Sequence, residues 1–86
     1  MPEISRFFGI VISMYFNDHW PPHFHARYGD ADAVIDIENL TYLRGWLPGR
    51  AMELVGEWAM IHHDELMANW ARARERKPLV KIEPLS

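Results

Sequence analysis

The feature that most constrains the fold is the division of this 86-residue chain at Pro48. Before that proline, short runs rich in β-branched and aromatic residues are separated by Gly, Asn, Asp and Pro, which is typical of strands joined by turns. After it, apolar residues recur every three or four positions, as in amphipathic helices. Strands that precede helices, rather than alternate with them, indicate an α+β domain.

The first part of the chain predicts four strands, at residues 9–16, 23–28, 32–38 and 41–44. Their connections are short, and one of them contains Gly29-Asp30, which favours a tight turn. Because strands joined by short turns usually pair with their neighbours in sequence, we predict an antiparallel meander.

The second part predicts two helices. Pro48 suits the first turn of a helix, because its φ is fixed and its missing N–H would have no partner there. A second helix is expected to begin at Asp64-Glu65, whose carboxylates favour the positive end of the helix dipole, and to stop before Pro78. One helix bent near residues 62–63 is the alternative, since no Gly or Pro forces a break there. The apolar lines are Ala51, Leu54, Val55, Trp58, Ile61 and His62, followed by Leu66, Trp70 and Ala73.

We therefore predict a single α+β domain over residues 1–86, in which a small antiparallel sheet of three to five strands packs against two C-terminal helices. Residues 1–47 form the β-rich half and residues 48–78 the helical half. Residues 79–86 are expected to supply a last strand, returning to the sheet, and a tail.

The composition excludes several classes of function. The chain has no cysteine, which excludes disulfides, thiolate zinc sites and cysteine nucleophiles. Its apolar runs are far shorter than the roughly 18–20 residues of a membrane span. The N-terminus lacks the basic and apolar regions of a signal peptide, so we expect a cytoplasmic protein without a membrane partner. A formal charge of −3 argues against strong nonspecific binding to nucleic acid.

Histidines cluster in residues 17–25, with the sequence Asn-Asp-His-Trp-Pro-Pro-His-Phe-His. Imidazole has an unperturbed pKa of roughly 6.5 and is the commonest metal ligand in proteins. The doubled proline stiffens the turn that carries these rings. Chemistry is therefore expected at this loop and at the strand that follows it.

Alternation along that strand predicts its two faces. Phe24, Ala26 and Tyr28 should face the helices together with Ile35 and Ile37 of the next strand. The opposite, polar face is expected to carry His23, His25, Arg27, Asp36 and Glu38, with Ser13 and Tyr15 from the first strand.

Three interpretations of the polar face remain open. In the first, His23 and His25, roughly 6–7 Å apart on one side of a strand, chelate a divalent metal such as zinc, with His19 or Asp18 as third ligand. In the second, the site performs metal-independent acid–base chemistry on RNA. The third is structural, with the histidines capping a loop and filling a partly buried gap. No cofactor is assumed except the metal of the first interpretation.

The acid–base interpretation assigns roles to particular side chains. One histidine accepts a proton, another donates one, and Arg27 stabilises the phosphate charge. The predicted catalytic set is His23, His25, Arg27 and Asp36. The predicted binding residues are His19, Trp20 and Tyr15. Trp20 lies in a polar loop, where its ring can stack on a base or a partner protein.

Several segments carry a resemblance to a known family. They are residues 1–10, 14–19, 21–25, 33–37, 57–59 and 81–85, with His62, Glu65-Leu66 and Asn69-Trp70. On these, and above all on Pro-Pro-His-Phe-His, the chain resembles the bacterial family catalogued as domain of unknown function 4160. The resemblance implies a small free-standing cytoplasmic protein, often encoded beside a second small protein (the 2442 family) in a toxin–antitoxin-like arrangement. It implies no catalytic residues.

The leading functional hypothesis is therefore one component, the toxin in particular, of a toxin–antitoxin-like pair that acts on or near RNA through its histidine face. The expected partner is a small protein encoded nearby. A noncatalytic protein-binding or regulatory module and a small metal-binding protein are the alternatives. Neither enzymatic activity nor oligomeric state is decided by the sequence.

Overall fold

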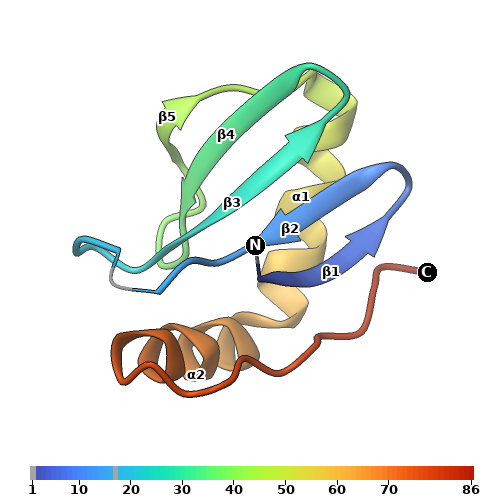
Figure 1. Cartoon of the computed structure of the whole chain (residues 1–86). Coiled ribbons are helices and arrows are strands. Elements are labelled where there is room, and N and C mark those ends of the chain that lie inside the picture. The colour runs from blue at the N-terminus through green and yellow to red at the C-terminus, as the bar shows by residue number, and fades with distance from the viewer. Residues whose placement is uncertain (1, 17) are drawn as a thin grey trace.

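The computed structural model describes residues 2–16 and 18–86, in which five strands precede two helices (Figure 1). The predicted α+β fold is confirmed, with the sheet at the upper end of the expected range of strands. Within these residues no helix has the length and apolar character needed to cross a membrane. The elements are β1 (Glu3–Phe7), β2 (Ile10–Ser13), β3 (His23–Tyr28), β4 (Ala31–Asp36), β5 (Tyr42–Gly45), α1 (Gly49–Ile61) and α2 (His63–Arg74).

The sheet is a meander. Its strand order is β1-β2-β3-β4-β5, and each neighbouring pair is antiparallel. The strand predicted over 9–16 is shorter, because the chain leaves the sheet after Ser13. β1 is not predicted from the sequence: it is short, and an irregularity between Glu3 and Ser5 interrupts its two-residue period. It folds back on β2 through Phe8 and Gly9, which both have positive φ.

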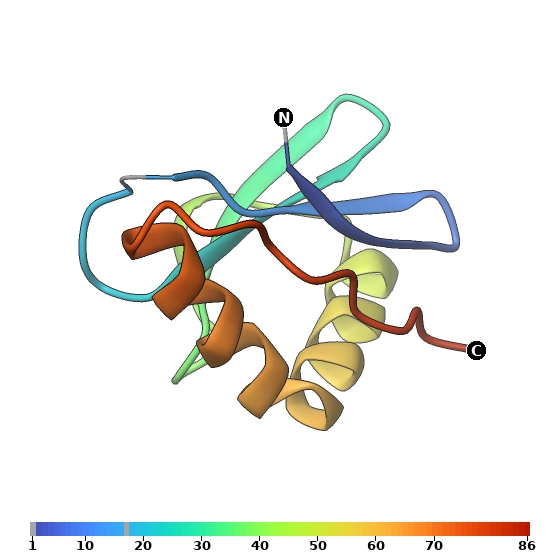
Figure 2. The same cartoon turned by 60° about the horizontal axis from the view of Figure 1, so that its bottom comes forward.

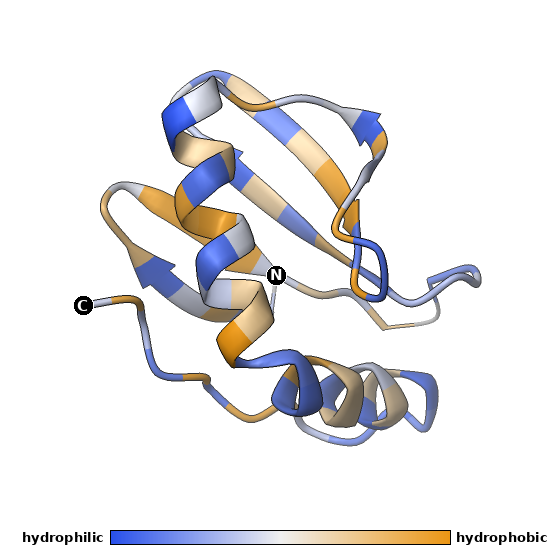
Figure 3. Ribbon diagram, turned by 180° about the vertical axis from the view of Figure 1, so that it is seen from behind, coloured by the Kyte–Doolittle hydropathy of each residue, from blue (hydrophilic) through white to orange (hydrophobic). Residues whose placement is uncertain are grey.

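The helices bury one face of the sheet (Figures 2 and 3). α1 crosses that face, and α2 lies at the end of the sheet where β3 begins. Trp58 of α1 is fully buried, with its ring 5.3 Å from that of Phe7 and 6.0 Å from that of Phe24. Tyr28, expected in this core, remains 41% exposed because it ends β3 beside the turn. The fully buried set includes Ile10, Ile12, Phe24, Ile35, Ile37, Val55, Trp58 and Leu66.

Two helices form, not one. α1 ends at Ile61 and α2 begins at His63, with His62 between them at φ −108° and ψ 27°. α2 starts one residue before the predicted Asp64. The break between the helices lies at His62 and His63, where the sequence has no Gly or Pro. The bend turns α2 away from the direction of α1 (Figure 1).

Residues 77–86 are extended but form no strand, which differs from the strand expected near residues 79–83. The reason is that the tail is hydrogen-bonded to the rest of the protein mainly through side chains rather than through a neighbouring strand. Asn69 donates from Nδ2 to the Val80 carbonyl (2.8 Å) and accepts at Oδ1 from the Val80 N–H (2.9 Å). Trp58 Nε1 donates to the Glu83 carbonyl (2.8 Å). A single backbone bond, from Ile82 N–H to the Ile4 carbonyl, joins the tail to β1.

Candidate functional site

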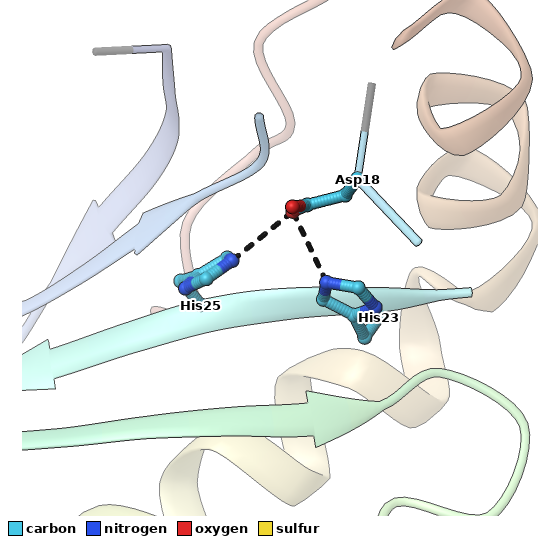
Figure 4. A group of neighbouring side chains, drawn as sticks. All are labelled: Asp18, His23 and His25. Carbon is cyan, nitrogen blue, oxygen red and sulfur yellow. Dashed lines mark hydrogen bonds and ion pairs between the residues drawn. The ribbon is translucent and has the colours of Figure 1, made fainter. Parts of the chain in front are cut away.

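The loop from β2 to β3 brings a carboxylate over two histidines of β3 (Figure 4). Asp18 Oδ2 lies 3.1 Å from His23 Nε2 and 3.2 Å from His25 Nε2. One ligating atom from each of these three residues lies within 4.8 Å of the other two. We call Asp18, His23 and His25 the Asp–His cluster. The predicted pairing of His23 with His25 on one side of the strand thus matches the geometry, because alternate residues of a strand share a face.

His23 is held from several sides. Only 8% of the residue is exposed, and its ring packs 5.1 Å from that of Trp70 in α2. Its Nδ1 lies 2.7 Å from the Pro21 carbonyl oxygen. A carbonyl oxygen carries no proton, so Nδ1–H is the donor of this bond. The second proline of the loop, Pro22, is itself buried, and its carbonyl accepts from the Ile37 N–H, which ties the loop to the end of β4.

His25 faces a more open environment than His23. Its side chain is 26% exposed, against 10% for His23. The ring of Tyr15 meets it edge to face, with 4.5 Å between the ring centroids. Tyr15, one of the predicted binding residues, therefore lies beside the Asp–His cluster, with its ring against that of His25.

The outer face of the sheet forms a hollow of about 550 Å³, which extends from His25 towards β5. Arg27 follows His25 on the same face of β3. Pairing of Val34 with both His25 and Arg44 brings Arg44 of β5 to this surface as well. We call this the open-face hollow; its polar lining is Ser13, Tyr15, His25, Arg27, Asp32 and Arg44.

The two arginines of the open-face hollow are exposed, and neither forms an ion pair within 4.0 Å among residues 2–16 and 18–86. Asp32 pairs with Arg27 in the strand register but not through its carboxylate. With two guanidinium groups and one carboxylate, that of Asp32, the lining of the hollow is locally positive on a chain of net charge −3. Guanidinium groups are suited to bind phosphate or carboxylate.

Other predicted site residues lie apart from the Asp–His cluster. Asp36 is opposite His23 in the strand register, but its Oδ1 accepts from the N–H groups of Glu38 (2.8 Å) and Asn39 (3.0 Å). Its carboxylate thus stabilises the turn after β4. Glu38, expected on the polar face, lies instead 3.3 Å from Nε2 of His63 in α2. The hydrogen bond from the His63 ring to the Asp64 carboxylate, together with Glu38, raises the pKa of His63 above its ordinary value.

The loop residues behave differently from one another. His19 is exposed and is not part of the converging group, so Asp18, not His19, is the side chain that approaches both histidine rings. Trp20, two residues after Asp18 in the loop, is 71% exposed. Asn17, which begins the loop motif, lies outside the described residues.

Arg44 and Asp32 are the site residues that the sequence did not reveal. Both reach the open-face hollow only because β4 pairs with β3 and β5 in a particular register. An alternating pattern shows which residues of one strand share a face, but not which residues lie opposite on the next strand. The nearest signal was the position of Arg44 in a predicted short strand, which alone does not relate it to His25.

Comparison with known proteins identifies one relationship. Residues 9–71 match the sequence model of a family described as "Domain of unknown function (DUF4160)". No curated protein and no solved structure matches the chain. The matched segment contains every residue of the Asp–His cluster and of the open-face hollow.

Proposed function

This chain belongs to the DUF4160 family, and from that premise we propose that it acts on RNA through the open-face hollow as one component, the toxin, of a toxin–antitoxin-like pair. The two-protein part of the proposal is supported by the genomic neighbour that the family resemblance implies. The RNA part is supported by the site itself.

The observation that carries the proposal is the presence of Arg27, Arg44 and His25 in one hollow. Its volume of about 550 Å³ is in the range of small-molecule and cofactor sites, so it can accept a nucleotide unit rather than a whole duplex. Guanidinium groups bind phosphate oxygens through paired, charge-assisted hydrogen bonds. A phosphodiester held by the two arginines would lie beside the Asp–His cluster, whose side chains are of the types that accept and donate protons.

The arginines provide the most direct test. We expect Arg27→Ala and Arg44→Ala each to weaken binding of a labelled single-stranded RNA by about ten- to a hundredfold, the value of a charge-assisted hydrogen bond to an ion. Each substitution should also reduce the slope of log affinity against log salt by about 0.7, since one phosphate contact is lost. Fluorescence anisotropy at several salt concentrations measures both quantities.

Arg50→Ala is the matched control for this test, because Arg50 is exposed on α1 and is not part of the hollow's lining, and among the described residues its ion pair is with Glu53 alone. It should leave RNA affinity within about twofold. Overproduction of the wild-type protein alone should inhibit growth, and His25→Ala should abolish that inhibition without unfolding the protein. A wild type that neither inhibits growth nor binds RNA more tightly than a variant carrying both Arg27→Ala and Arg44→Ala would refute the proposal.

A second candidate function is a noncatalytic protein-binding module, which the exposure of Trp20 favours. An indole 71% exposed on a loop is suited to anchor a partner, because aromatic side chains contribute strongly at the centre of protein interfaces. If this candidate holds, the protein copurifies in equal amounts with the small protein encoded beside it and cleaves no RNA. Trp20→Ala should then weaken the complex by about 30-fold or more, measured by calorimetry, whereas the arginine variants should not. Retention of full affinity by Trp20→Ala would exclude Trp20 as the anchor.

A further inference from the structure

We propose that Asp18, His23 and His25 form a binding site for one divalent transition-metal ion, of which zinc is the reference case. The inference concerns the metal alone and does not depend on RNA being the substrate. It assigns Asp18 as the third ligand and leaves His19 outside the site.

The first argument is the tautomer of His23. Its Nδ1–H donates to the Pro21 carbonyl, so in the neutral ring Nε2 carries a lone pair and no proton. That lone pair points at Asp18 Oδ2, 3.1 Å away, which is also an acceptor. Two acceptors facing each other at hydrogen-bond distance require a positive charge between them. A proton shared between the two groups or a metal ion supplies it.

The second argument is the arrangement around His23. A metal-bound histidine usually donates its other ring N–H to a carbonyl or carboxylate, which fixes the ring and raises its basicity. The Pro21 carbonyl has this role here, at 2.7 Å. Burial of His23 against Trp70 restricts the ring further. His23 is thus oriented before any ion arrives, and the ordering of this ligand costs little at binding.

The third argument is the spacing of the ligating atoms. Two ligands about 2.0–2.1 Å from a zinc ion at a tetrahedral angle lie about 3.3–3.4 Å from each other. Asp18 Oδ2 lies 3.1 Å and 3.2 Å from the two histidine nitrogens, close to that separation. The ligating atoms of the two histidines lie within 4.8 Å of each other. A rotation of the more exposed His25 ring would bring them to the separation that zinc requires.

The donor set also indicates the class of metal. Two imidazole nitrogens and one carboxylate oxygen suit zinc and the other first-row divalent ions, whereas calcium and magnesium prefer sites built from oxygen. Three protein ligands leave one coordination position for water, as in catalytic zinc sites and unlike closed structural ones. Because His25 also lines the open-face hollow, a bound water would lie near the place proposed for the phosphodiester.

Asp18→Asn is the sharpest test, because it keeps the size of the side chain and changes only its chemistry. The amide can donate to the Nε2 lone pair of His23, so the fold should be retained while the anionic ligand is lost. Untagged protein treated with chelator is titrated with Co²⁺ and followed by visible absorption, then with Zn²⁺ by calorimetry. We expect one ion per chain for the wild type, and affinity reduced by about a hundredfold or more for Asp18→Asn and His25→Ala, beyond the 10–100-fold typical of outer-shell changes.

Two controls separate this site from adventitious binding. His19→Ala removes an exposed histidine next to Asp18, and His63→Ala removes one that lies beside Asp64 and Glu38. Both should bind Co²⁺ like the wild type. Circular dichroism in the presence of chelator should show Asp18→Asn folded, with a thermal midpoint no lower than that of the wild type.

The inference is overturned if the wild type binds no stoichiometric ion, or if Asp18→Asn binds it equally well. A marked loss of stability in metal-free Asp18→Asn would also overturn it, since that result indicates that the contact between Asp18 and His23 is structural. These outcomes are distinct from failure of the proposed function. The arginine variants report on RNA, and the cobalt spectrum is measured with no RNA present.

Discussion

Trp58→Ala is expected to lower the free energy of unfolding by about 3–5 kcal/mol, the usual cost of removing a buried large aromatic side chain. Trp58 is fully buried between α1 and the sheet, in contact with Phe7 and Phe24. The substitution leaves a cavity that its neighbours can fill only in part. It also leaves the Glu83 carbonyl without the donor at 2.8 Å that fixes the tail. For a domain of ordinary stability, about 5–15 kcal/mol, this is a large fraction of the total.

Urea unfolding followed by circular dichroism measures this loss without depending on tryptophan fluorescence. Trp46→Ala is the matched control, because Trp46 is 66% exposed and its removal should change the stability by about 0.5 kcal/mol or less. Trp58→Phe keeps an aromatic ring but no N–H, so its stability should lie between those of the wild type and the alanine variant. Equal stabilities of Trp58→Ala and Trp46→Ala would show that the core is not centred on α1 as described.

Asn69→Ala is expected to cost about 2–3 kcal/mol and to release the C-terminal tail. Asn69 is fully buried, and its amide binds both backbone groups of Val80 while its Oδ1 also accepts from Arg72 Nη1 at 2.9 Å. Alanine removes all three hydrogen bonds, and each buried group left without a partner costs about 1–3 kcal/mol, less where water can reach it. Val80 itself is 52% exposed, so water replaces part of the loss.

The effect on the tail has a local readout. The Ile82 N–H donates to the Ile4 carbonyl, and hydrogen exchange at this amide should become faster in Asn69→Ala than the change in global stability explains. Asn69→Asp should be at least as destabilising as alanine, because a carboxylate cannot donate to the Val80 carbonyl. Asn39→Ala, at an exposed turn position, is the control and should leave exchange at Ile82 unchanged. Unaltered exchange at Ile82 in Asn69→Ala would show that Asn69 does not hold the tail.

Much of the fold could be predicted from the sequence because its signals are local. The alternating run at residues 23–28 matches β3, and the three- and four-residue spacing after Pro48 gave both helices to within a few residues. β1 was missed because its period-two pattern is interrupted at Glu3–Ser5 and it is stable only when paired with β2. The tail was misjudged for a related reason. Its partners are buried side chains 11 and 25 residues earlier in the chain, and no local pattern indicates them.

For the site, too, local sequence patterns determined some features and the tertiary structure determined the others. That His23 and His25 share a face, and that Trp20 stands in a polar loop, follow from alternation and composition, which each segment of sequence determines by itself. The approach of Asp18 Oδ2 to both rings, and the arrival of Arg44 in the open-face hollow, were decided only by the tertiary structure. The path of a loop and the pairing of strands depend on burying the core around Phe24, Ile35 and Trp58, which is a property of the whole chain.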